Sequence, residues 1–180
     1  GFCSEGKYCG TEELFSNNGF EIDSDNNGIP DGFDRTGSAG NSVIDTREKY
    51  KGARSIKLTS RYGSFGQTVN LQRGSFYSFI AFVKGGCRNI ALYYNDNEGR
   101  GHNLNYEARN RYWYWSATPV WQPITMDFTA PAAILRNLRI ECSDTVEAGR
   151  IYPILWVDAI HLERNIQDQP SALVNDCGYC

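Results

Sequence analysis

Short runs of β-branched and aromatic residues recur along almost the whole chain, and turns rich in glycine and asparagine separate them. Such runs are typical of strands bounded by tight turns. The apolar period of about 3.6 residues that marks an amphipathic helix is hard to find anywhere. We therefore predict an all-β fold, an antiparallel β-sandwich of about ten strands. The predicted strands are residues 14–21, 42–46, 54–59, 66–71, 76–83, 90–94, 112–116, 123–128, 138–142 and 154–162.

Two of these regions differ in how their apolar residues are spaced. Residues 137–142 alternate, with Leu138, Ile140 and Cys142 on one face and polar side chains on the other. Residues 76–83 are apolar on both faces, which is typical of a strand in the middle of a sheet that is covered on both sides. The two patterns predict two antiparallel sheets, one of which has a partly apolar outer face.

Size and charge argue against several classes of protein. A length of 180 residues predicts one domain, residues 1–180. A net charge of -3 argues against nucleic acid or an anionic membrane as the main partner. No apolar run approaches the roughly 18 residues of a membrane span. The first residue is Gly1 rather than Met, which is typical of a processed chain or a fragment.

Six cysteines form an even set, which favours disulfide bonds. They are Cys3, Cys9, Cys87, Cys142, Cys177 and Cys180. Cys87 and Cys142 each end an apolar strand pattern, so we expect them to pair across neighbouring strands. We expect the other four to bridge the two ends of the chain, because the termini of a domain are often close in space. The alternatives for these four are a zinc ion held by four thiolates, a redox Cys-Gly-Tyr-Cys motif at residues 177–180, and disulfides between subunits. Disulfides place the protein outside the reducing cytosol and predict an extracellular, secreted protein.

An Asp-rich loop at residues 23–34 has the spacing of a calcium ligand set. Side-chain oxygens fall at positions 1, 3, 5, 9 and 12 of the loop, which are Asp23, Asp25, Asn27, Asp31 and Asp34. Gly28 stands where such a loop turns, and the next residue, Ile29, offers a backbone carbonyl. The last position is Asp instead of the longer Glu of an EF-hand, and no helix pattern flanks the loop. We predict a structural Ca²⁺ site; the alternative is a solvated turn between strands.

Seven segments follow one another in a characteristic order: residues 16–21, 28–33, 52–59, 66–71, 74–84, 121–131 and 154–162. This order resembles the jelly-roll carbohydrate-binding modules of the family 4, 16 and 22 group. The resemblance spans about residues 11–164 and leaves cysteine-bearing extensions at residues 1–10 and 165–180. It implies a jelly-roll fold and noncatalytic binding of a polysaccharide or surface glycan.

The resemblance also implies metal ligands outside the Asp-rich loop. Modules of this group typically hold a structural Ca²⁺ where the first strand, the following loop and the last strand meet. Carried over, Glu21 and Asp158 become candidate ligands, while Ala159 stands where the family often has a second Asp. The sequence leaves open whether these residues and the Asp-rich loop form one calcium site or two.

The resemblance to the family 22 members implies sugar-binding residues. An Arg, a Trp, a Tyr and a Glu commonly line the binding face there, and the matching residues are Arg61, Phe65, Tyr106 and Glu141, with Phe replacing Trp. Aromatic rings cover the C–H face of a sugar, while Arg and Glu bond its hydroxyls. The alternative is a surface ion pair between Glu141 and either Arg61 or Arg139.

A second aromatic concentration lies at residues 112–115. On a strand, Trp113 and Trp115 face one way and the two tyrosines between and before them face the other. We expect one pair to lie in the core and the other to form a sugar platform or a subunit interface. The family pattern implies that Trp121 is a core residue.

No pattern of catalytic residues is evident. The two histidines, His102 and His161, have no partner pattern for a triad or a metal triangle, and no nucleophile elbow, phosphate loop or dinucleotide motif occurs. We predict a noncatalytic glycan-binding module. The competing hypothesis is a structural subunit of an extracellular filament, surface layer or viral appendage that self-assembles through its jelly-roll domain, an idea favoured by the terminal cysteines.

Overall fold

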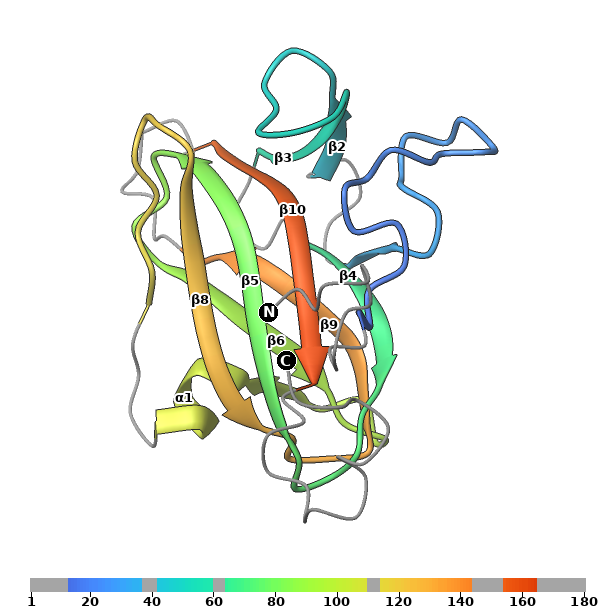
Figure 1. Cartoon of the computed structure of the whole chain (residues 1–180), viewed down its shortest axis with the longest axis vertical. Helices are drawn as coiled ribbons and strands as arrows, with labels where there is room; N and C mark the ends of the chain where they lie inside the picture. The colour runs from blue at the N-terminus through green and yellow to red at the C-terminus, as the bar shows by residue number, and fades with distance from the viewer. Residues whose placement is uncertain (1–12, 37–41, 60–63, 110–113, 144–153, 165–180) are drawn as a thin grey trace, which may run out of the picture.

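The chain folds into two five-stranded sheets that pack face to face (Figure 1). The computed structural model describes residues 13–36, 42–59, 64–109, 114–143 and 154–164. Sheet I has the order β1-β4-β9-β6-β7 and contains β1 (Asp34–Thr36), β4 (Ser64–Asn70), β9 (Ile134–Cys142), β6 (Ile90–Asn95) and β7 (Gly101–Asn103). Sheet II has the order β2-β3-β10-β5-β8 and contains β2 (Ser42–Asp45), β3 (Ser55–Leu58), β10 (Leu155–Arg164), β5 (Phe76–Gly85) and β8 (Gln122–Thr129). Neighbouring strands within each sheet pair antiparallel, so the predicted antiparallel β-sandwich is confirmed.

Eight of the ten predicted runs coincide with strands, and two do not. Residues 14–21 form turns, because Asn17 and Phe20 take positive φ angles of 52° and 61°, which an extended strand cannot accommodate. In the described part of the run at residues 112–116, only Trp115 makes an isolated bridge, to Ile90. The prediction of a strand was therefore wrong at residues 14–21 and in the described part of the second run, residues 114–116.

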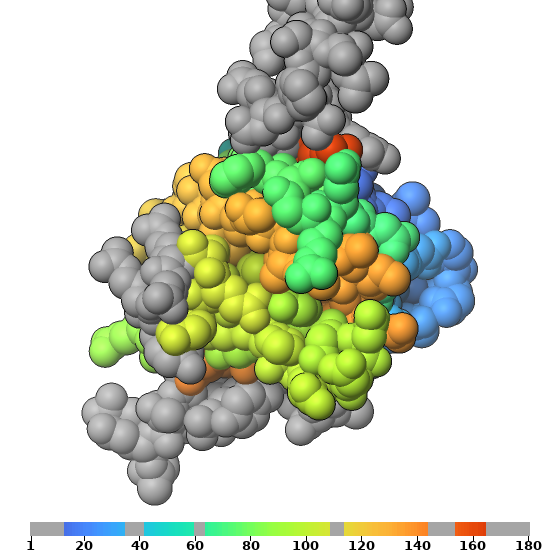
Figure 2. Space-filling model, turned by 90° about the horizontal axis from the view of Figure 1, so that it is seen from below, coloured from blue at the N-terminus to red at the C-terminus, as the bar shows by residue number. Residues whose placement is uncertain are grey.

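One short helix was missed by the sequence analysis, α1 (Leu104–Arg109). Asn103 lies just before it, and its side-chain oxygen accepts a hydrogen bond from the backbone N–H of Tyr106 (3.0 Å), which caps the first turn. The buried Asn105 side chain accepts the N–H of Leu92 (2.8 Å) and so fixes α1 to β6. Seen from below, α1 (yellow) and the turn between β6 and β7 (yellow-green) lie at the surface beside the β4–β5 turn (green) (Figure 2). Among the described residues no helix is long and apolar enough to span a membrane.

The core lies between the sheets and follows the alternation of the strands. On β9 the inward residues are Leu138, Ile140 and Cys142, as predicted. A group of phenylalanine rings fills the space beside them, with centroids 5.2–6.4 Å apart: Phe15, Phe20, Phe33, Phe65 and Phe79. Each buried ring stabilises the fold by about 2 kcal/mol.

The predicted disulfide between Cys87 and Cys142 is confirmed. It joins the end of β9 to the connection between β5 and β6, with the two Cα atoms 6.1 Å apart. Both residues are buried. The other four cysteines, Cys3, Cys9, Cys177 and Cys180, lie outside the described residues, so their pairing stays a prediction.

Sheet II carries apolar side chains on its outer face as well as its inner face. Its strand β5 lies between β10 and β8, as expected for a run that is apolar on both sides. Tyr50 stacks on the outward ring of Phe82 with centroids 3.7 Å apart and planes within 10°. The ring centroids of Trp121 and Tyr50 are 6.1 Å apart, and Trp121 is half-buried. Trp121 is therefore part of this outer layer, and its assignment to the core was wrong.

Candidate functional site

The outer face of sheet I carries a cluster of polar side chains around one tyrosine ring. On β6 and β9 the residues Leu92 and Ile140 point into the core, so their neighbours on the same strands point outward. The strand register sets Tyr93 directly opposite Arg139. These two side chains, with Asn95 and Glu141 from the same two strands, form what we call the Tyr93 cluster.

Arg139 is the centre of the Tyr93 cluster. Its guanidinium carbon lies 5.6 Å from the centroid of the Tyr93 ring, and its Nη1 donates a hydrogen bond to the Asn95 side-chain oxygen (3.1 Å). Its Nε lies 3.6 Å from a carboxylate oxygen of Glu141. The side chains of Arg139 and Glu141 are only 15% and 10% exposed. The ion pair expected as an alternative to sugar binding therefore exists between these residues, and it is largely shielded from solvent.

This arrangement suits the recognition of a neutral ligand that has many hydroxyl groups. The guanidinium and the carboxamide offer hydrogen-bond donors in fixed directions, and the carboxylate offers acceptors. Because Arg139 and Glu141 have opposite charges, the cluster presents little net charge. The ring of Tyr93, held by the guanidinium, supplies an apolar surface beside these polar groups.

Two predicted sugar-binding residues are placed differently by the structure. Phe65 is 2% exposed and packs against Phe20 and Phe33 in the core. Its ring cannot stack on a sugar, so this assignment was wrong; the alternation of β4 turns Phe65 inward and its neighbours outward. Trp115 is half-buried, packs against the core and pairs with Ile90 through both backbone hydrogen bonds (2.9 and 3.0 Å).

The remaining predicted sugar-binding residues have different outcomes. Glu141 lies in the Tyr93 cluster. Tyr106 lies on α1 and is 38% exposed, and its role in sugar binding stays a prediction. Arg61 and Trp113 lie outside the described residues. Sequence reasoning missed Tyr93 and Asn95, because their position depends on how β6 pairs with β9.

The Asp-rich loop brings three of its predicted ligands together. Asp23, Asp25 and Asp31 each have a carboxylate oxygen within 4.8 Å of the others. The backbone N–H of Asn27 donates to both Asp23 and Asp25 (3.1 Å each), and the Asn27 side chain donates to Asp25 (2.7 Å). Hydrogen bonds from Ser24 lower the pKa of Asp31, so its carboxyl group is ionised at neutral pH. Three carboxylates therefore lie within 4.8 Å of one another, and carboxylate oxygens are the kind of ligand that calcium prefers.

Asp34 does not join this group. It is an exposed residue at the start of β1, whereas the carboxylates of Asp23, Asp25 and Asp31 meet within the loop. The structure therefore does not place Asp34 as a ligand of the same ion.

Glu21 and Asp158 belong to a second hydrogen-bond network, around the loop at residues 49–54. Asp158, which is fully buried, accepts the backbone N–H groups of Tyr50 (2.8 Å) and Lys51 (3.0 Å). Glu21 accepts hydrogen bonds from the backbone N–H groups of Ala53 (2.9 Å) and Arg54 (3.4 Å). Together the two carboxylates hold this loop from either side.

The electrostatics of this second network favour a bound cation. Burial raises the pKa of Asp158, the backbone N–H groups oppose that shift, and the negative charge of Glu21 adds to it. A divalent cation beside the two carboxylates would remove this repulsion. The residues therefore fit the calcium position that the family resemblance implies. The structure separates the predicted ligands into this pair and the Asp-rich loop.

Comparisons with known proteins identify the architecture. No protein-family model matches the chain, and no curated protein sequence matches it significantly. Solved structures do match. The xylan-binding domain CBM22-1 of Xyn10C from Paenibacillus barcinonensis is 13% identical, with a TM-score of 0.55 over 88% of this chain and 97% of that domain. A CBM4 structure is 17% identical, with a TM-score of 0.55 over 83% of this chain and 99% of that one. TmCBM61 in complex with β-1,4-galactotriose is 17% identical, with a TM-score of 0.55 over 86% of this chain and 99% of that one.

The chain has the jelly-roll fold of carbohydrate-binding modules. This confirms the resemblance that the order of sequence motifs indicated. At 13–17% identity the likeness concerns the fold. What the chain binds must therefore be argued from its own side chains.

Proposed function

We propose that the chain is a noncatalytic, extracellular carbohydrate-binding module that binds a polysaccharide or surface glycan through the Tyr93 cluster on the outer face of sheet I. The observation that carries the proposal is the packing of Arg139 between the Tyr93 ring (5.6 Å), Asn95 (3.1 Å) and Glu141 (3.6 Å). The jelly-roll fold supports the same conclusion. The Cys87–Cys142 disulfide supports an extracellular location.

The cluster would recognise a sugar in two ways. The Tyr93 ring would cover the C–H face of a pyranose, which is a large apolar contact with few rotatable bonds to restrain. Arg139, Asn95 and Glu141 would exchange hydrogen bonds with its hydroxyl groups, and partial burial would strengthen these bonds against competition from water. Because the similar structures include a xylan-binding domain and a complex with β-1,4-galactotriose, β-linked polysaccharides are the first ligands to test.

A glycan array followed by calorimetry tests the proposal. Tyr93→Ala should weaken binding about five- to tenfold, since stacking on one aromatic ring is worth about 1–1.5 kcal/mol. Tyr50→Ala is the matched control, because Tyr50 is 46% exposed on the outer face of sheet II. Equal binding by the two variants, or a blank array with folded wild-type protein, would refute the proposed site.

Structural calcium is the second part of the proposal. Asp23, Asp25 and Asp31 would hold Ca²⁺ with help from Asn27 and the Ile29 carbonyl, and a further Ca²⁺ would lie between Glu21 and Asp158. The convergence of carboxylates at 4.8 Å or less supports the first position. The burial of Asp158, together with the nearby negative charge of Glu21, raises its pKa and supports the second. The ion would neutralise these carboxylates and close the loops, and the glycan would bind elsewhere.

Self-assembly as a structural subunit is the alternative function. It would require a contact surface, for which the apolar side chains that are exposed individually are the candidates: Val43, Tyr50, Phe76 and Val120. A second copy covering such residues would bury apolar surface that a monomer leaves in water. Light scattering separates the two functions. Large ordered assemblies together with a blank glycan array would favour the structural subunit, whereas a monomer that binds a glycan would favour the module.

A further inference from the structure

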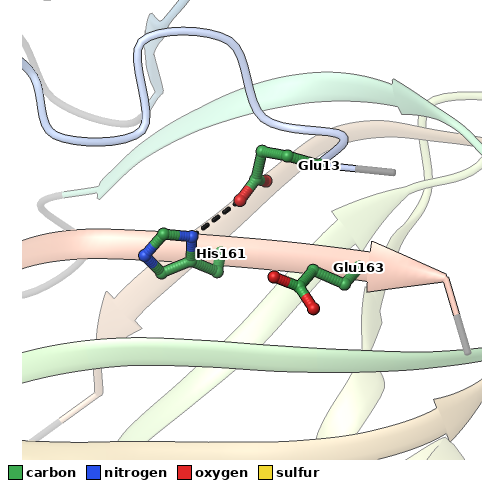
Figure 3. A group of neighbouring side chains, drawn as sticks. All are labelled: Glu13, His161 and Glu163. Carbon is green, nitrogen blue, oxygen red and sulfur yellow. Dashed lines mark hydrogen bonds and ion pairs between the residues drawn. The ribbon is translucent and has the colours of Figure 1, made fainter. Parts of the chain in front are cut away.

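A His-and-carboxylate cluster lies where the N-terminal segment meets the last strand. His161 and Glu163 are two residues apart on β10, so their side chains share one face of the strand. Glu13 pairs with Glu163 in an isolated antiparallel bridge, which sets its side chain beside them. Figure 3 shows the three side chains together, with Glu13 hydrogen-bonded to the His161 ring. One carboxylate oxygen of each Glu and one ring nitrogen of His161 all lie within 4.8 Å of one another.

Glu13 is held in place by hydrogen bonds to both of its oxygens. Oε1 accepts the backbone N–H groups of Phe15 (2.9 Å) and Leu162 (3.1 Å), while Oε2 contacts His161 Nδ1 (2.7 Å) and accepts from Asn18 (3.2 Å). Burial alone would raise the pKa of Glu13, but these hydrogen bonds lower it below its usual value, so the carboxylate is charged. The first ligand is therefore oriented by the backbone before any ion binds.

His161 is positioned by contacts to one nitrogen of its ring. The ring nitrogen Nδ1 faces Glu13 and also lies 3.2 Å from the Asn18 side-chain nitrogen. Asn18 in turn is attached to β10, because its carbonyl accepts the N–H of Ile160 (3.0 Å). The carboxylate of Glu163 accepts no hydrogen bond from the described part of the chain. It adds a second negative charge near the ring and is available to a cation.

We propose that Glu13, His161 and Glu163 bind a divalent transition-metal ion such as Zn²⁺, through His161 Nδ1 and one oxygen of each carboxylate, with water completing the coordination. An imidazole nitrogen beside two carboxylates suits zinc and its neighbours in the first row, whereas the oxygen-only Asp-rich loop suits calcium. The ion replaces the proton between His161 and Glu13 and relieves the repulsion between the two carboxylates. It cross-links the N-terminal segment to β10.

The other histidine of the chain provides a contrast. His102 also has two carboxylate neighbours, but Asp96 contacts its Nε2 (3.1 Å) and Glu107 contacts its Nδ1 (3.0 Å). The two carboxylates therefore lie on opposite edges of the ring and do not share a nitrogen. That arrangement suits a protonated imidazolium between two anions, and His102→Gln is a matched control for His161→Gln.

The test uses the whole chain, saturated with Ca²⁺ so that oxygen-only sites are filled, and Zn²⁺ as the probe. NMR spectra of the imidazole groups follow binding directly, because the chain has only two histidines. We expect Zn²⁺ to shift the resonances of His161 and leave those of His102 in place. Calorimetry on Glu163→Gln should show binding about tenfold weaker or more, while His102→Gln should bind as the wild type does.

Two results would overturn the proposal. One is an unchanged His161 resonance at Zn²⁺ concentrations that saturate any other site. The other is equal Zn²⁺ affinity in the wild type, Glu163→Gln and His161→Gln, since zinc held by cysteine thiolates would not depend on these residues. Circular dichroism of Glu163→Gln confirms that the variant is folded, and its carboxamide keeps the size of the side chain.

Discussion

Replacing Gly52 by alanine tests whether the Glu21 network holds the loop at residues 49–54 in place. Gly52 has a φ of 69°, and a Cβ there would lie 1.9 Å from Glu21 Oε1 and 2.8 Å from its carboxyl carbon. Alanine would first incur the cost of a left-handed backbone, about 1–2 kcal/mol. It would also displace the Glu21 carboxylate from the N–H groups of Ala53 and Arg54. The loss of these hydrogen bonds would lower the free energy of unfolding by a further ~1–2 kcal/mol. This is less than is usual for hydrogen bonds to a charged group, because Glu21 is exposed to solvent.

Gly74→Ala separates the two contributions. Gly74 has a φ of 81°, but a Cβ there meets nothing within 4 Å. We therefore expect Gly74→Ala to lower the free energy of unfolding only by the cost of the left-handed backbone. Gly52→Ala should lower it by about 1–2 kcal/mol more. Urea unfolding measures both, and with a slope of about 2 kcal/mol/M the two midpoints should differ by ~0.5–1 M. Equal midpoints would show that Glu21 does not hold the loop, and would remove the structural support for Glu21 as a calcium ligand.

Three other perturbations have expected outcomes. Chelation of a calcium-loaded sample should lower the melting temperature by several degrees, because an ion present at 100 times its dissociation constant contributes about 2.7 kcal/mol; an unchanged Tm would contradict structural calcium. The pKa of His102 is raised, first by its hydrogen bond to Asp96 and also by Glu107. Its stabilisation is therefore fully present below about pH 6.5 and is lost as pH rises through the raised pKa, so His102→Gln should flatten stability measured against pH in this window. Replacing Cys87 and Cys142 by alanine opens a loop of 55 residues and should cost about 4 kcal/mol in chemical unfolding; a loss near zero would mean that the crosslink does not restrain the unfolded chain.

The fold was largely predictable from local patterns. Strands such as residues 137–142 can be recognised in the sequence because polar and apolar side chains alternate between the solvent face and the core face. This alternation is a property of consecutive residues. The pairing of Cys87 with Cys142 followed from their places at the ends of apolar runs. The turn at residues 14–21 was mistaken for a strand because its apolar side chains are buried by tertiary contacts, whereas its backbone is bent by Asn17 and Phe20.

The candidate sites depended on contacts that alternation does not specify. Alternation says that Phe65 and its neighbours face opposite ways, but the sheet order decides which of them meets the core. Tyr93 meets Arg139 only because β6 pairs with β9 in one register. Glu13 and His161 are 148 residues apart and meet because the N-terminal segment that follows Glu13 turns over β10 instead of forming the predicted strand. The sequence by itself determined the sandwich and its disulfide, because strand alternation is local. The tertiary structure decided which residues share a site, because strand order and register arise from packing between distant parts of the chain.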